Sequence, residues 1–102
     1  MDFKVSYIRD SVSEISRRIG YVIIDNNGAN EYNLVKKISG GNFPRFHIYL
    51  KDRGENLLFS LHLDQKAPVY RGAGVHAHNG EYFGPVVEQE AERIEEILDD
   101  KD

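Results

Sequence analysis

The clearest pattern in the chain is an alternation of apolar and polar residues in two neighbouring stretches near its middle. Apolar side chains occupy every second position in residues 45–51 and again in residues 57–63. Since successive side chains of a β-strand point to opposite faces, the pattern predicts two strands that each bury one face. Residues 52–55 form a turn signal between them, which favours an antiparallel pair. The buried positions would be Phe46, Ile48, Leu50, Leu57, Phe59, Leu61 and Leu63.

A spacing of three to four residues between apolar positions predicts a short helix before Gly20 and a longer helix after Gly84. The first helix begins with a capping box, in which the side chains of Ser11 and Glu14 each accept a backbone amide of the other residue. The second opens with Pro85, at a position where a helix tolerates proline. The apolar stripes are Val12, Ile15 and Ile19 in the first helix, and Val87, Ala91, Ile94 and Leu98 in the second.

Shorter stretches complete the predicted sheet. Residues 21–24 are apolar and mostly β-branched, a strong turn signal follows at residues 25–28, and a further strand is expected at residues 31–38. Residues 3–8 also alternate, and form either a short strand or part of a loosely attached arm at residues 1–9. Residues 65–84 have no periodicity, so they form a long functional loop or contain one more strand, at residues 75–78.

These elements together predict an α+β fold. We expect one domain over residues 1–102, with an antiparallel sheet of three to five strands and with a short N-terminal and a longer C-terminal helix packed on one face. Residues 99–102 would form an acidic tail. A chain of 102 residues can bury one modest core without help from metal ions or disulfides.

Composition narrows the classes of function. The chain has no cysteine, which excludes disulfides, thiolate zinc sites and thiol nucleophiles. No apolar run approaches the roughly 18 residues that a membrane span requires, and the first residues lack the basic and then apolar pattern of a secretion signal. We therefore expect a cytoplasmic protein without a membrane partner.

The net charge of -4 is unevenly distributed. Residues 88–102 carry eight acidic side chains against two basic ones, a net charge of -6, so the rest of the chain has a net charge of +2. An acidic balance argues against a dedicated nucleic-acid binder, because binding to phosphates relies on cations. Because the acidic residues are concentrated at the C-terminal end, the argument is weaker, but it still holds in part.

The polar side of the two central strands gathers the chain's most reactive side chains. If paired residue numbers sum to 109, Arg45 faces Asp64 and His47 faces His62; if they sum to 107, Arg45 faces His62 and His47 faces Ser60. Either register places two imidazoles, a carboxylate and a guanidinium within cross-strand reach.

This set of residues suggests acid–base chemistry on an RNA phosphodiester. A histidine oriented by a carboxylate can exchange protons near neutral pH, and the 2′-hydroxyl of RNA supplies a nucleophile without a metal or other cofactor. We assign the catalytic roles to His47, His62 and Asp64, and substrate binding to Arg45, Tyr49 and Lys66. The alternative is that these polar pairs only make one face of the sheet soluble.

His76 and His78 form an H-x-H pair whose side chains would point the same way on an extended strand. That arrangement suits a metal ion, provided that Glu81, His62 or Asp64 supplies a third ligand. The alternative is two histidines exposed on a loop.

Three segments of the sequence resemble a family of small uncharacterised proteins of bacteria and archaea. They are FPRFHIY at residues 43–49, FSLHLDQK at residues 59–66 and HNGEY at residues 78–82. The resemblance extends over most of the chain from Gly20 onward and implies no particular activity.

The order helix, antiparallel strands, helix is also distantly similar to that of HicA-type toxins, which are messenger-RNA interferases. The resemblance implies a double-stranded-RNA-binding-like fold and ribonuclease activity. Those toxins carry a histidine on a central strand after a Gly-Ser segment, and His47 after Gly40 and Gly41 holds the nearest position here. The chain lacks their Gly-Ser-His-His run and is more acidic.

Three functions follow from the sequence. The favoured one is an RNA-interacting protein, with metal-independent ribonuclease activity of the toxin type. The second is a non-catalytic interaction module for a protein partner or for a second copy of the chain. The third is a metal-binding protein that uses His76 and His78.

Overall fold

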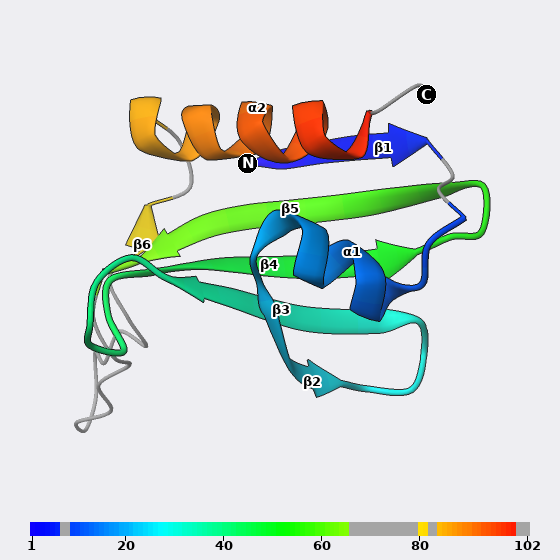
Figure 1. The fold of residues 1–102 in the computed structure, drawn as a ribbon, viewed down its shortest axis with the longest axis horizontal. Coiled ribbons are helices and arrows are strands. Elements are labelled where there is room, and N and C mark those ends of the chain that lie inside the picture. Colours follow the sequence, from blue (N-terminus) through cyan, green and yellow to red (C-terminus); the bar gives the residue numbers. More distant parts are fainter. Residues whose placement is uncertain (7–8, 66–79, 82–83, 100–102) are drawn as a thin grey trace, which may run out of the picture.

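The computed structural model describes residues 1–6, 9–65, 80–81 and 84–99. It confirms an α+β fold with an antiparallel sheet, a short N-terminal helix and a longer C-terminal helix (Figure 1). The strands are β1 (Asp2–Ser6), β2 (Val22–Asn26), β3 (Glu31–Lys37), β4 (Arg45–Asp52), β5 (Asn56–Asp64) and β6 (Gly80–Glu81), and the helices are α1 (Val12–Ile19) and α2 (Pro85–Leu98).

The sheet has the order β1-β5-β4-β3-β2, and every pairing is antiparallel. The two-residue β6 pairs with the last residues of β5. Residues 2–6 therefore form an edge strand rather than a loose arm. The further strand expected at residues 75–78 lies outside the described residues.

The ends of the helices follow the signals in the sequence. Ser11 and Glu14 make both hydrogen bonds of the capping box, and Gly20 ends α1 in the left-handed conformation with φ of 85°. Pro85 occupies the first turn of α2. All three features depend only on neighbouring residues, which is why the sequence predicts them.

The turn between β2 and β3 lies later than the sequence indicated, because β2 continues through Asn26. Two side chains explain the shift: Oδ1 of Asn26 accepts from the amide of Gly28, and Oδ1 of Asn27 accepts from the amide of Ala29. These local bonds build the reversal on the residues that follow the strand. The register of the pair also slips between Ile23 and Asp25.

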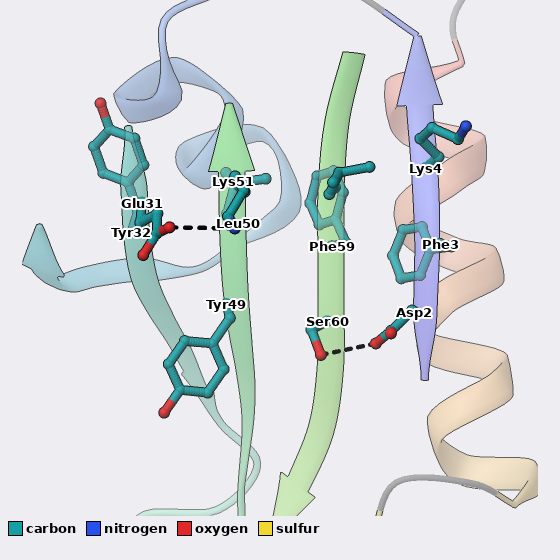
Figure 2. A pocket seen from close by; sticks show the side chains of 11 residues that line it. Asp2, Phe3, Lys4, Glu31, Tyr32, Tyr49, Leu50, Lys51, Phe59 and Ser60 are labelled. Carbon is teal, nitrogen blue, oxygen red and sulfur yellow. Dashed lines mark hydrogen bonds and ion pairs between the residues drawn. The ribbon is translucent and has the colours of Figure 1, made fainter. Parts of the chain in front are cut away.

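Both helices cover the same face of the sheet. Helix α2 contacts β1, β5 and α1, while α1 also contacts β2. Figure 2 shows the opposite side of the sheet, with both helices behind the strands. The core between the helices and the sheet includes every apolar position predicted for the two central strands, together with Val12, Ile15, Ile19, Val87, Ala91, Ile94 and Leu98.

We call the side of the sheet turned away from the helices the polar face. On β4 and β5, the side chains between the core positions lie on this face. Strands β1 and β3 flank them, so the polar face spans four adjacent strands. Its members from β4 and β5 are Arg45, His47, Tyr49, Lys51, Leu58, Ser60, His62 and Asp64.

Candidate metal centre

Two adjacent strands bring the predicted catalytic residues together. In the β4–β5 pair His47 is opposite His62 and Arg45 is opposite Asp64, which is the first of the two registers considered. A three-residue loop sets this register: Gly54 has a φ of 81°, and the amide of Arg53 donates to the carbonyl of Asn56. A slip of one residue would move the apolar positions of β5 out of the core, so burial reinforces the loop.

The nitrogen atoms of the two histidines and the carboxylate of Asp64 converge on one point. His47 Nδ1 lies 3.2 Å from His62 Nε2. His62 Nε2 lies 3.0 Å from Asp64 Oδ1, and His47 Nδ1 lies 3.6 Å from Asp64 Oδ2. We refer to His47, His62 and Asp64 as the triad. It is the one group of three histidine or acidic residues, among those described, with the geometry to hold a metal ion.

Asn33 on β3 determines which nitrogen of His47 faces the triad. Its Oδ1 lies 2.8 Å from His47 Nε2. Since an amide oxygen can only accept, Nε2 carries the proton, and in the neutral ring the lone pair of Nδ1 is then directed at His62 and Asp64. Such an outer hydrogen bond is how proteins orient a histidine that binds a metal ion. No pattern in the sequence marks Asn33 as a site residue; its one signal is a polar side chain at an alternate position of β3.

The triad is more enclosed than the sequence suggested. His62 and Asp64 point to the predicted face but are only 4% and 5% exposed. The side chain of His47 is 11% exposed, and its ring lies 4.7 Å from those of both Tyr49 and His62. A buried site of this kind strengthens electrostatic interactions, because little water screens them.

Two of the predicted substrate-binding residues border the triad. Arg45 Nε lies 3.8 Å from Asp64 Oδ2, and its guanidinium carbon lies 4.5 Å above the ring of Phe43. Tyr49 is 54% exposed, and its ring lies 6.1 Å from that of His62. The third, Lys66, and the predicted metal ligands His76 and His78 lie outside the described residues, so their assignments stay predictions.

Charges of both signs share the polar face. Lys51 Nζ lies 3.3 Å from Glu31 Oε2, and Asp2 accepts a hydrogen bond from Ser60 Oγ at 2.8 Å. Near the triad, Lys37 is the cross-strand partner of Arg45. The described part of this face is therefore mixed in charge, where a surface for RNA would be predominantly basic.

A second polar cluster lies between the helices, away from the triad. Tyr21 Oη donates to Glu90 Oε2 at 2.6 Å, and Arg93 donates to both carboxylate oxygens of Glu90 and to the carbonyl of Ile19. Burial favours a raised pKa for Glu90, but the bonds from Arg93 and Tyr21 outweigh it and hold the pKa below its usual value. Burial and the adjacent carboxylate raise the pKa of Tyr21. The cluster joins α2 to the end of α1, which is a structural role.

Comparisons with known proteins identify no relative. No protein family, no curated protein and no solved structure matches the chain. The resemblances to the small prokaryotic proteins and to the HicA-type toxins consequently stay predictions. Among the described residues, no helix is long and apolar enough to cross a membrane.

Proposed function

We propose that the protein binds a divalent transition-metal ion at the triad, as a mononuclear site of the catalytic type. The observation that carries this proposal is the convergence of His47 Nδ1, His62 Nε2 and the carboxylate of Asp64: the two nitrogens lie 3.2 Å apart, Oδ1 lies 3.0 Å from His62 Nε2, and Oδ2 lies 3.6 Å from His47 Nδ1. A metal ion would bond to all three atoms at once. Zinc is our first choice, because two imidazoles and a carboxylate are typical zinc ligands.

The separations agree with the size of a metal ion. Ligand atoms at about 2.0–2.2 Å from an ion lie roughly 3.3–3.6 Å apart in a tetrahedral site and roughly 2.8–3.1 Å apart in an octahedral one. The N···N separation in the triad is 3.2 Å, and the N···O separations are 3.0 Å to Oδ1 and 3.6 Å to Oδ2 of Asp64, all close to these two ranges. The ligand set is also that of the iron(II) facial triad, so iron is the competing ion.

The residues that contact the triad from outside also suit a metal site. By accepting from Nε2 of His47, Asn33 selects the neutral tautomer in which Nδ1 can act as a ligand atom, and Arg45 lies beside the carboxylate of Asp64. Three protein ligands are the number found in catalytic zinc sites, where a water molecule takes the fourth position. An ion held in this way lowers the pKa of bound water and polarises carbonyl or phosphoryl oxygens. We infer that the reaction supported by the site is a hydrolysis.

Zinc binding by wild-type protein and by two variants tests the proposal. The protein, freed of metal by chelator, is titrated with zinc in competition with a chromophoric chelator. We expect one zinc ion per chain, with affinity lowered in His62→Ala and in Asp64→Asn by more than the 10–100-fold that loss of an outer partner typically costs. Asp64→Asn keeps the shape of the side chain, and circular dichroism confirms that both variants are folded.

The sequence-based alternatives give different results in the same assays. A double variant, His76→Ala with His78→Ala, that abolishes zinc binding while His62→Ala does not would place the ion at the H-x-H pair. RNA cleavage that persists with excess chelator and disappears in His47→Ala would support metal-independent ribonuclease chemistry at the triad. Either result would overturn the proposal.

A further inference from the structure

Strand β2 forms one edge of the sheet. Among the described residues, it pairs only with β3. Figure 1 shows β2 at the opposite edge from β1, the strand that α2 contacts. An edge strand presents backbone amides and carbonyls along its outer side, so it can accept a further strand.

The side chains of β2 make this edge apolar. Val22 and Ile24 are aliphatic, yet they are 65% and 52% exposed. They alternate with Ile23, which packs partly buried against the core, so Val22 and Ile24 share the polar face. Single exposed aliphatic residues are common on protein surfaces, but two on one face of an edge strand favour association, because natural edge strands usually carry charges there.

The three apolar residues of β2 are self-complementary in one antiparallel register. If a second copy pairs through the same strand about a two-fold axis at Ile23, then Ile23 lies opposite its own copy, and Val22 lies opposite Ile24 on both sides of the axis. An axis at Val22 would instead place Ile24 opposite Gly20, and an axis at Ile24 would place Val22 opposite Asn26. Only the register centred on Ile23 covers all three apolar side chains with apolar partners.

The acidic end of the strand keeps this contact short. Asp25 follows a slip in the register with β3, and β2 ends at Asn26. In the register centred on Ile23, the Asp25 residues of the two copies are four positions apart along the pair, which is about 13 Å. This distance exceeds the Debye length at physiological salt, so their repulsion is weak. A contact the length of one short strand is small for a protein interface, so the expected dimer is weak.

We propose that two copies of the chain associate through β2, in an antiparallel pair centred on Ile23. Since the strand pairings within the chain are also antiparallel, the two sheets join as one continuous sheet with a strand β1 at each end. Each copy uses its β2 edge once, so the dimer is closed and does not grow into a filament. The polar faces of both copies lie on the same side of the joined sheet.

Analytical ultracentrifugation of the wild-type chain tests the inference. We expect the average mass to rise with concentration from that of the monomer toward twice that value, with a dissociation constant on the order of 100 µM. Val22→Lys and Ile24→Lys should each weaken the association by about ten-fold or more, because aliphatic burial is lost at two symmetry-related places. Val86→Lys is the matched control: Val86 is an exposed aliphatic residue on α2, away from β2, and its replacement should leave the association unchanged.

Single cysteine variants test the register, since the chain has no cysteine of its own. Under mild oxidation, Ile23→Cys should form a disulfide-linked dimer, because directly opposite residues of an antiparallel pair have Cα atoms about 4.5–5.5 Å apart, a distance that a disulfide spans. Ile24→Cys places its thiol opposite Val22, two positions from its own copy, so it should cross-link much more slowly. Circular dichroism confirms that every variant is folded.

Three results would each overturn the inference. The first is a wild-type chain that stays monomeric at about ten times the expected dissociation constant. The second is association that Val22→Lys and Ile24→Lys leave unchanged, which would place the contact on another surface. The third is faster cross-linking of Ile24→Cys than of Ile23→Cys, which would contradict the register. The samples contain no zinc, so the outcome does not depend on the proposed metal site.

Discussion

His47 Nδ1 and His62 Nε2 lie 3.2 Å apart, on side chains that are direct cross-strand partners in β4 and β5. Two imidazole nitrogens at this distance share either one proton or one cation. Asn33 holds the proton of a neutral His47 on the far side of its ring, so a proton between two neutral rings must come from His62. His62 Nε2 also lies 3.0 Å from Asp64 Oδ1, which competes for the same proton. A metal ion relieves the competition, because it bonds to all three atoms.

Zinc should raise the thermal stability of the protein. A ligand that binds only the folded state stabilises it by about 2.7 kcal/mol when its concentration is 100 times the dissociation constant. For a domain of this size, each kcal/mol raises Tm by about 4–8 °C, so we expect a shift of roughly 10–20 °C. Differential scanning calorimetry measures the shift, and excess chelator should reverse it. A Tm that does not change with zinc would contradict the metal site.

Replacement of Asn33 by alanine should weaken zinc binding by about 10–100-fold, as expected for loss of an outer hydrogen bond. The reason is that His47 would no longer be held with its lone pair toward the triad. Competition titration measures the affinity, and cobalt absorption spectra show whether the ligand geometry changes. Asn33→Asp, which keeps an accepting oxygen, should retain most of the affinity, while Asn42→Ala on an exposed loop is the control. Equal affinity in Asn33→Ala and the wild type would exclude this role.

Local signals predicted most of the fold, and distant contacts limited what could be predicted of the site. Alternation assigned the faces of β4 and β5, and capping signals placed both helices, because each depends on neighbouring residues. The choice between the two β4–β5 registers needed the conformation of the loop at Gly54. The hydrogen bond from His47 Nε2 to Asn33 depends in turn on how β3 pairs with β4, and the connection between these strands has no strong register signal.

The cluster between the helices escaped prediction for a related reason. Tyr21 and Glu90 are 69 positions apart in the sequence. Glu90 is one of eight acidic residues in the segment 88–102, and nothing in the sequence distinguishes it from the others. Only the packing of α2 beside α1 shows that this one is buried.

Tyr21→Phe should destabilise the protein by about 1–3 kcal/mol, because it leaves a buried carboxylate oxygen without one of its donors. The hydroxyl of Tyr21 donates to Glu90 at 2.6 Å, and both residues are buried. Urea unfolding at neutral pH measures the loss. Tyr49→Phe removes a hydroxyl from an exposed tyrosine and should change the free energy of unfolding by less than about 0.5 kcal/mol. Equal stability of the two variants would rule out a stabilising role for the buried bond.

Glu90→Gln should change how stability depends on pH. The groups facing Glu90 are Tyr21, Arg93 and, more distantly, Lys36, and together they hold the pKa of Glu90 below its usual 4.5. Since the folded pKa is lower than the unfolded one, the ionised carboxylate stabilises the fold above about pH 4.5, and this contribution is lost as the pH falls through the folded pKa. We expect wild type to be more stable than Glu90→Gln at pH 7, with the difference shrinking toward pH 3. Urea unfolding across this range measures it, and a difference that is constant with pH would show that Glu90 contributes through shape rather than charge.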